Sequence, residues 1–338
     1  MKILIDAFGG DNSPQDVIAG TVAAVKAKKG FTAVLVGNKE LLDVHLSRYG
    51  YPQDRIEILD AKQVITCEEE PTVGVRTKPD STICKAFKEL KDNEDAKAFV
   101  SAGSTGAVLV GATLKLGRIK GVARPALCPV IPTLTGKNVF LIDSGANADC
   151  KAINLCQFAV MGTVYAKSMG VENPKVALLS NGTENEKGNA LNHEVFPMLK
   201  EMKGINFIGN MEAREILSGD ADVIVSDGFS GNIAIKSIEG AVKTMLLAIK
   251  DTVNGSLMGK IGGLFLKKRL KKLKEKLDYN KKGGALFIGV NKPVIKAHGS
   301  SKKDAFKSII LQSVSYAEFD LADKITAALE ENGVANAQ

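Results

Sequence analysis

The regular alternation of strand-like and helix-like segments constrains the fold of this chain more than any other feature. Short runs of β-branched and other apolar residues are each followed by a longer segment with the apolar spacing of a helix. The predicted strands are Lys2–Asp6, Ala33–Val36, Ile56–Leu59, Ala98–Ser101, Val139–Ile142, Val176–Leu179, Ile205–Ile208, Val223–Val225, Gly284–Val290 and Val294–Lys296. The predicted helices lie near residues 13–28, 39–48, 81–90, 104–116, 151–168, 186–203 and 230–253, with further helix towards the C-terminus. This alternation predicts an α/β fold, with a mostly parallel sheet between helical layers in an α/β/α sandwich.

Composition narrows the class further. The 338 residues, of which 45% are hydrophobic and 25% charged, are enough for one large core or two smaller ones. No repeat or linker divides the sequence, so residues 1–338 are expected to form a single α/β unit, with two lobes as the alternative. The absence of Trp leaves few platforms for stacking bases, and no nucleic-acid partner is expected. Five Cys without a CxxC pair and three His indicate neither a disulfide framework nor a metal site.

The first residues do not resemble a targeting segment. The sequence MKILIDAFGGD reaches Asp6 after an apolar run that is too short for a signal peptide. No run approaches the roughly 20 apolar residues of a membrane span. We therefore expect a cytoplasmic protein with reduced thiols.

The net charge of +7 is concentrated in one segment. Residues 257–278 contain eight Lys or Arg and two acidic residues. Leucines recur at spacings of four and three residues between Leu266 and Leu277, as on one face of a helix. Range 255–282 is therefore predicted to be a basic amphipathic helical segment in two pieces, with a flexible joint at Gly262-Gly263.

Five of the predicted strands end in loops rich in Gly and short polar residues. These loops are DAFGGDNSP at 6–14, SAGSTGA at 101–107, DSGAN at 143–147, NGTENEKGN at 181–189 and DGFSGN at 227–232. In a parallel sheet such loops gather at the carboxyl edge, where open α/β sheets bind ligands. Backbone amides and small hydroxyl or amide side chains at helix N-termini favour an anion. The same residues also form ordinary turns, but five such loops together favour a binding site.

Lys187, in the loop at 181–189, is the cation that points most clearly to a bound anion. With Thr183 as the N-cap, Glu186 would complete a capping box and Lys187 would lie in the first helical turn. The helix dipole disfavours a cation there by about 0.3–1 kcal/mol, so a Lys at this position suggests a bound anion. The alternatives are a solvated Lys187 or an ion pair with Glu184.

Other polar residues also follow strands. Asp143 and Asp227 end strands beside Gly, where they can position a donor or a base or can act as structural turn residues. Asn232 and Lys236 are one helical turn apart and can face the same cleft. His298 follows the last predicted strand and can be a general acid, a phosphate ligand or a structural group.

Familiar nucleotide and hydrolase signatures are missing from these loops. The sequence has no GxxxxGK[ST], which disfavours a P-loop nucleotidase, and its first strand runs into GGDNSP instead of GxGxxG. It also lacks GxSxG, the marker of a nucleophilic serine elbow.

Taken in order along nearly the whole chain, the motifs resemble those of the bacterial phosphate acyltransferases of the PlsX family. The matching segments are IDAFGGDNSP, SAGSTGA, LIDSGAN, QFAVMG, ENPKVALLSNGTENEKGN, GNMEAREILSG, ADVIVSDGFSGN, LDYNKKGGALFIGV and VIKAHGSS. The resemblance implies a fold like those of phosphotransacetylases and isocitrate or isopropylmalate dehydrogenases. It also implies a homodimer that moves a fatty acyl group from acyl-carrier protein to inorganic phosphate. The acyl phosphate product would serve a membrane glycerol-3-phosphate acyltransferase in phospholipid synthesis.

The implied reaction needs no covalent nucleophile from the protein. Phosphate is itself the nucleophile, so the protein has to hold it against a thioester and stabilise an oxyanion. Lys187, Asn189 and His298 are the expected catalytic residues, with His298 or solvent protonating the departing thiolate. No cofactor is expected. The expected phosphate-binding residues are Gly103, Ser104, Thr105, Gly106, Asp143, Asn147, Asn181, Gly182, Thr183, Asp227, Asn232 and Lys236.

The basic segment suggests a surface contact. A helical apolar stripe flanked by cations suits an anionic membrane or the acidic face of acyl-carrier protein, with packing on the dimer mate as a third interpretation. The expected contact residues are Leu264, Phe265, Lys268, Arg269 and Lys272. Alternative functions are a phosphotransacetylase that uses acyl-coenzyme A, a nicotinamide-dependent decarboxylating dehydrogenase, and a non-enzymatic membrane-surface module.

Overall fold

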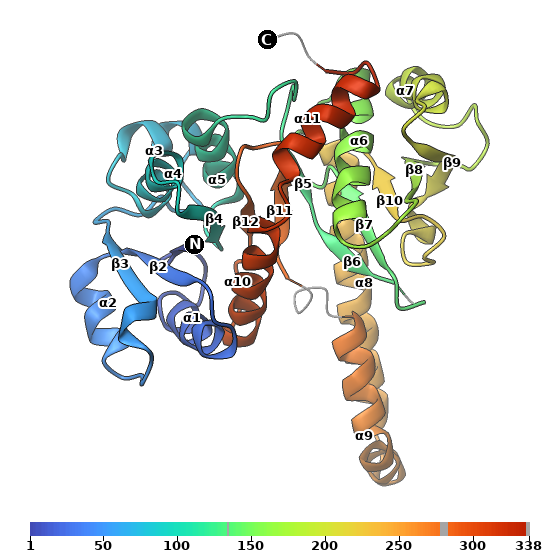
Figure 1. Ribbon diagram of the computed structural model, residues 1–338. Helices are drawn as coiled ribbons and strands as arrows, with labels where there is room; N and C mark the ends of the chain where they lie inside the picture. The colour runs from blue at the N-terminus through green and yellow to red at the C-terminus, as the bar shows by residue number, and fades with distance from the viewer. Residues whose placement is uncertain (134, 278–282, 336–338) are drawn as a thin grey trace.

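Two β-sheets flanked by helices form the body of the molecule (Figure 1). The computed structural model describes residues 1–133, 135–277 and 283–335. The strands are β1 (Lys2–Asp6), β2 (Thr32–Gly37), β3 (Ile56–Asp60), β4 (Ala96–Ser101), β5 (Ala126–Cys128), β6 (Val130–Pro132), β7 (Asn138–Ile142), β8 (Lys175–Ser180), β9 (Asn206–Glu212), β10 (Val223–Val225), β11 (Ala285–Ile288) and β12 (Val294–Lys296). The α-helices are α1 (Gln15–Ala27), α2 (Lys39–Leu46), α3 (Pro71–Thr77), α4 (Thr82–Asp92), α5 (Thr105–Gly111), α6 (Ala152–Ser168), α7 (Ala190–Glu201), α8 (Gly228–Asn254), α9 (Leu257–Leu277), α10 (Lys303–Ala317) and α11 (Leu321–Glu331).

The predicted α/β class is confirmed, and the strands divide between two mostly parallel sheets. The first sheet has the order β3-β2-β1-β4-β12-β11-β5, in which only β11 runs antiparallel to its neighbours. The second has the order β6-β7-β10-β8-β9, in which only the β6–β7 pair is antiparallel. The chain passes from one sheet to the other at Pro129, between β5 and β6. Proline has no backbone N–H for a ladder, so it suits the point where pairing changes.

Central strands are buried on both faces, as expected of parallel strands between helical layers. In β1, Ile3 and Ile5 belong to the core that includes buried residues of α1 and α10. Leu4, which points to the other face, belongs to a second core with Phe87 of α4 and Phe99 of β4. This arrangement explains why the strands read as continuous apolar runs instead of alternating ones.

One core joins the two sheets. Phe140 of β7 packs edge-on against Tyr165 of α6, with ring centroids 4.9 Å apart. Tyr165 in turn packs edge-on against Tyr316 of α10 at 5.5 Å, and the two buried hydroxyls hydrogen-bond. Residues of both sheets therefore lie in the same apolar cluster.

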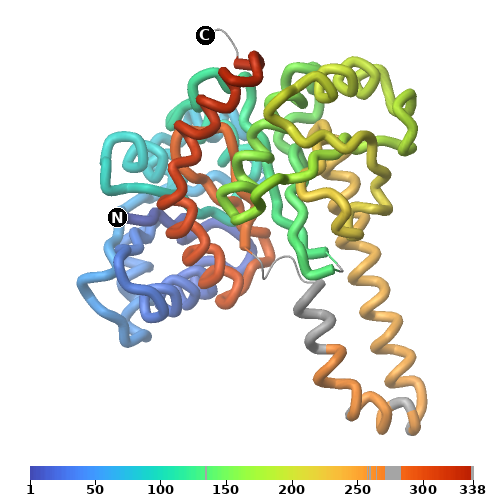
Figure 2. The backbone as a smooth tube through the Cα atoms, turned by 45° about the vertical axis from the view of Figure 1, so that its right-hand side comes forward, coloured from blue at the N-terminus to red at the C-terminus, as the bar shows by residue number. Residues whose placement is uncertain are grey.

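Helices α8 and α9 form a hairpin that projects from the body (Figures 1 and 2). The predicted flexible joint at Gly262-Gly263 is wrong, because α9 is continuous through both glycines. A Cβ on Gly263 would lie 2.4 Å from Cγ1 of Val253 in α8, so this glycine lets the two helices approach closely. Within the described ranges no helix is both long and apolar enough to cross a membrane.

Candidate functional site

A cleft of about 350 Å³ opens between the two sheets, beside the crossing from β5 to β6. Its walls come from the segments that follow β4 and β7, from the first turns of α8, and from β12 with the loop after it. Four predicted site residues lie together in its lining: Thr105, Asn232, Lys236 and His298. The position of the cleft agrees with the prediction that loops at the carboxyl ends of the strands build the site.

The N-terminus of α8 positions two of these residues. Asp227 is the N-cap, and its Oδ1 accepts a hydrogen bond from the backbone N–H of Ser230 at 2.7 Å. Asn232 and Lys236 follow, spaced by one helical turn, and both line the cleft. A Cβ on Gly231 would lie 2.0 Å from the carbonyl oxygen of Asp143, so only glycine allows α8 to start this close to the loop after β7.

Asp143 organises the loop at 143–147. Its Oδ1 accepts from the backbone N–H groups of Leu127, Gly145 and Ala146, and its Oδ2 accepts from the backbone and the side chain of Asn147. Burial raises the pKa of Asp143, and these hydrogen bonds oppose that rise. The second amide hydrogen of Asn147 goes to the carbonyl of Pro125. These contacts favour the structural alternative for Asp143 and leave Asn147 without a spare side-chain donor.

A second buried carboxylate supports the loop after β4. Asp6 of β1 accepts a 2.7 Å hydrogen bond from the hydroxyl of Ser101, which accepts one from the backbone N–H of Gly103 at 3.0 Å. Burial raises the pKa of Asp6, and the Ser101 hydrogen bond opposes that rise. A Cβ on Gly9 would lie 2.6 Å from the nitrogen of Gly103, so the loops after β1 and β4 touch through their backbones.

The start of α5 brings Thr105 to the cleft. Ser104 caps this helix by accepting from the N–H of Ala107 at 3.4 Å. Gly106 lies under Pro71 of α3, where a Cβ would be 2.5 Å from the proline ring. Gly103, Ser104 and Gly106 therefore shape the loop, and Thr105 lines the cleft.

The loop at 181–189 differs from its prediction. Helix α7 begins at Ala190, and its cap is Asn189, whose Oδ1 accepts from the N–H of Asn192 at 3.0 Å. The predicted N-cap at Thr183 and the first-turn position of Lys187 are wrong. Gly188, with a φ of +118°, prevents a helix from continuing through this point.

Lys187 is exposed. The aliphatic part of its side chain packs over Gly182, where a Cβ would lie 2.7 Å from the lysine Cγ. Asn181, Thr183 and Asn189 are exposed as well. The loop follows β8, next to β10 in the second sheet, so it lies at the same sheet edge as the cleft. None of its residues lines the cleft itself.

His298 is exposed in the loop after β12. Its Nδ1 lies 3.2 Å from the backbone nitrogen of Ser300 and 2.8 Å from its hydroxyl. A backbone N–H can only donate, so Nδ1 accepts and the neutral ring carries its proton on Nε2. The side chain of Asn12 holds this loop by donating to the carbonyl of Ser300 at 3.2 Å.

Lys296, at the end of β12, is a cleft residue that the sequence analysis missed. Its Nζ donates to the carbonyls of Ala297 at 2.5 Å and Ala102 at 3.3 Å. Burial lowers the pKa of Lys296 to about 8, although Cys67, Asp6 and Asp11 act in the opposite direction. A charged residue at the end of a strand whose other residues are apolar was the available signal. Across the described ranges, no cluster of three His, Cys, Asp or Glu could hold a metal ion.

Solved structures with the same fold define the class of this protein. The chain superposes on a phosphotransacetylase from Streptococcus pyogenes with a TM-score of 0.60, at 20% identity and 94% coverage of each chain. A branched-chain phosphotransacylase from Enterococcus faecalis gives 0.56, at 14% identity over 95% of this chain and 99% of the other. At these identities the likeness concerns the fold alone, and the chain is an α/β protein with the fold seen in these two structures.

Sequence relatives define the family. The family described as "Fatty acid synthesis protein" matches residues 1–324. A phosphate acyltransferase from Clostridium novyi is 46% identical over 98% of this chain and 99% of its own length. Another from Clostridium perfringens is 47% identical over 99% of each. The chain belongs to the phosphate acyltransferase family, and it is an acyltransferase.

Proposed function

We propose that the protein transfers a fatty acyl group from acyl-carrier protein to inorganic phosphate and releases acyl phosphate for phospholipid synthesis. The observation that carries the proposal is the cleft at the carboxyl edge of both sheets. It gathers the cations Lys236 and Lys296 with the neutral donors Thr105, Asn232 and His298. Such a set suits an anionic nucleophile and a developing oxyanion.

In the proposed step a phosphate oxygen attacks the carbonyl carbon of the thioester. A carbon–oxygen bond forms, the tetrahedral intermediate collapses, and the carbon–sulfur bond breaks. The departing thiolate takes a proton from solvent, or from His298 when its ring has taken up a second proton, because the neutral ring with its proton on Nε2 is too weak an acid for this step. Lys187 and Asn189 lie on the loop after β8, at the carboxyl edge of the second sheet. They are proposed to contact the reacting groups from the side of the cleft. Holding both reactants in register supplies much of the rate enhancement.

The α8–α9 hairpin is the proposed contact with a membrane surface, which would make this a cytoplasmic protein that associates peripherally. Met258, Ile261 and Phe265 are exposed and recur at spacings of three and four residues, as on one helix face. Lys268 and Arg269 are exposed beside them. Of the other predicted contacts, the side chains of Leu264 and Lys272 lie outside the described residues. Residues 278–282 of the basic segment lie outside them too.

The remaining partners are also proposals. A homodimer would cover exposed apolar side chains of α8 such as Phe229, which is 62% exposed, and Ile233. A membrane glycerol-3-phosphate acyltransferase is the proposed consumer of the product, because an acyl phosphate is a reactive anhydride that needs prompt use.

Purified protein tests the proposed reaction directly. Acyl-carrier-protein thioester should be consumed only in the presence of phosphate, with the product trapped by hydroxylamine and the free carrier thiol measured in parallel. No metal or nucleotide should be required. Equal loss of thioester without phosphate would identify a hydrolase, and consumption of acyl-coenzyme A in preference to the carrier would favour the phosphotransacetylase alternative.

A further inference from the structure

We propose that Lys296 is the residue that holds the anionic nucleophile in the cleft between the two sheets. This inference rests on the proposed function and assigns its phosphate-binding cation. It differs from the sequence prediction, which gave that role to Lys187.

Among the candidate cations, Lys296 combines access to the cleft with partial burial. Lys187 and Lys236 are exposed, whereas Lys296 is half-buried and lines the cleft. An interaction between charges is several times stronger in a partly desolvated place than at a surface, because water screens it less. A phosphate in the cleft would therefore interact more strongly with Lys296 than with either exposed lysine.

The position of Lys296 is fixed by the sheet. It ends β12, where it pairs in register with Ser101 of β4. Two of its three N–H groups go to the carbonyls of Ala297 and Ala102. An ammonium group has three donors, so one remains for a ligand.

Within the described ranges the charge on Lys296 has no carboxylate in ion-pair contact. Asp6 and Asp11 act on it electrostatically. Asp6 already accepts hydrogen bonds from Ser101 and Phe8. An incoming anion would supply the close partner that a half-buried cation requires.

Neutral hydrogen-bond donors also line the cleft beside Lys296. Thr105 of α5 and Asn232 of α8 line the cleft together with Lys296, and His298 presents its Nε2–H from the adjacent loop. These groups come from both sheets. A tetrahedral anion would therefore meet donors from several directions, as a phosphate site requires.

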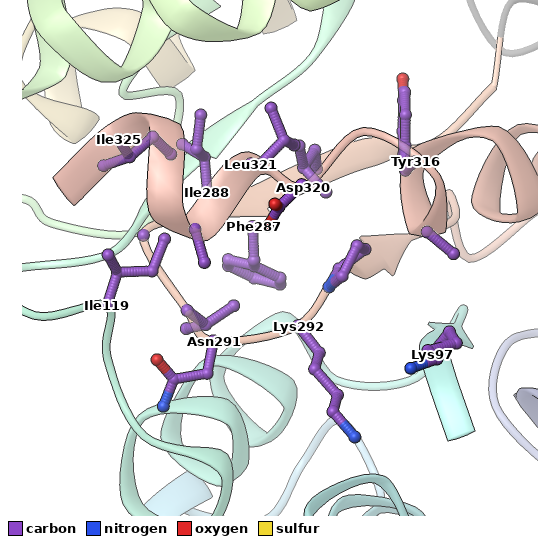
Figure 3. A pocket seen from close by; sticks show the side chains of 16 residues that line it. Lys97, Ile119, Phe287, Ile288, Asn291, Lys292, Tyr316, Asp320, Leu321 and Ile325 are labelled. Atoms are coloured by element: carbon purple, nitrogen blue, oxygen red, sulfur yellow. The ribbon is translucent and has the colours of Figure 1, made fainter. Parts of the chain in front are cut away.

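The test compares Lys296→Met with a matched control from the β11–β12 segment, where the two strands are antiparallel neighbours. Lys292 lies four residues away, in a smaller pocket of about 160 Å³ (Figure 3), and caps α4 by donating to the carbonyls of Leu90, Asn93 and Ala96. Burial also lowers its pKa. Lys292→Met thus removes a partly buried, carbonyl-bonded lysine that does not line the cleft.

Lys296→Met should raise the KM for phosphate by about 10- to 100-fold, the effect of losing one charge-assisted hydrogen bond. It should weaken the binding of phosphate alone, followed by calorimetry without acyl substrate, by a similar factor. Lys292→Met should lower the thermal midpoint but leave the phosphate KM within about twofold. Lys296→Arg, which keeps the charge, should recover part of the affinity if the larger head group fits.

The two proposals fail in different ways. If the wild-type protein transfers acyl groups and folded Lys296→Met keeps the wild-type phosphate KM, the assignment of Lys296 is wrong and the function stands. If phosphate binding depends on Lys296 but no acyl transfer occurs, the proposed function is wrong and the anion site stands. Should Lys296→Met not fold, phosphate binding by Lys296→Gln decides in its place.

Discussion

Charged residues at strand ends do different work in this molecule according to what surrounds them. Asp143 is enclosed by amide donors and shapes a loop, and Asp6, at the end of β1, accepts from the hydroxyl of Ser101 and the backbone N–H of Phe8. The Nζ of Lys296 donates to two carbonyls, those of Ala102 and Ala297, and the residue lines a cleft. Sequence alone places such residues at a sheet edge but does not reveal how many partners each of them has.

The lowered pKa of Lys296 predicts a pH effect on phosphate binding. As pH rises through about 8 the ammonium loses its proton, so the KM for phosphate should increase above that pH. The groups that act on it or share the cleft lining with it are Cys67, Asp6 and Asp11, together with Lys236 and Glu239 of α8 and His298 of the adjacent loop. Kinetics between pH 6.5 and 9.5 measure the effect, and the rise should be absent in Lys296→Met. An identical rise in that variant would assign the titration to another group.

Lys187 tests whether the loop after β8 takes part in the chemistry. If its ammonium meets charge that develops in the transition state, Lys187→Ala should lower kcat by about 10²-fold and leave the fold intact. Its exposed position means that the substitution removes little packing. Wild-type kcat at saturating phosphate in this variant would identify a solvated lysine.

At the scale of elements, most of the architecture follows from local patterns. The alternation of apolar runs and amphipathic segments predicted ten of the strands and most of the helices to within a few residues. Short elements without a period of their own, such as β5, β6 and α3, were not predicted. The start of α7 was misplaced because a sequence pattern at Thr183 satisfied the capping rule, while the backbone of Gly188 fixes the actual start further on.

The cleft was predictable only in part, because its composition depends on tertiary pairing. Thr105, Asn232, Lys236 and His298 follow strands and were found from loop chemistry. The division into two sheets depends on which strands pair across long sequence separations. That division decides that residues from β12 and α8 face each other.

The hairpin offers a prediction at two neighbouring glycines. Nothing lies within 4 Å of a Cβ placed on Gly262, so Gly262→Ala should stabilise α9 by about 1 kcal/mol through helix propensity. The same change at Gly263 meets Val253 at 2.4 Å, and it should destabilise the hairpin by about 1–3 kcal/mol. Hydrogen exchange of α9 amides measures both effects. Equal protection in the two variants would contradict the close contact.

At the scale of the whole molecule, a shared core holds the cleft between two sheets, while the far end of α8 and the helix α9 project away from it (Figure 2). This separation predicts that surface binding and catalysis can be altered independently. Met258→Glu combined with Phe265→Glu should abolish sedimentation with anionic vesicles, because it places two charges where apolar side chains would enter the bilayer.

Activity of the same double variant on acyl-carrier protein in solution should stay within about twofold of the wild type. Vesicle binding at wild-type strength would exclude the proposed membrane face. Loss of both binding and soluble activity would instead indicate that the hairpin docks the carrier.

Helix α8 gives this arrangement a fixed geometry. Its 27 residues begin at the cleft and end in the hairpin, which at about 1.5 Å per residue makes a rod of about 40 Å. If the tip of the hairpin rests on a bilayer with α8 upright, the cleft lies about 40 Å above the lipid surface. A newly made acyl phosphate would then have to cover most of the rod's length to reach the bilayer.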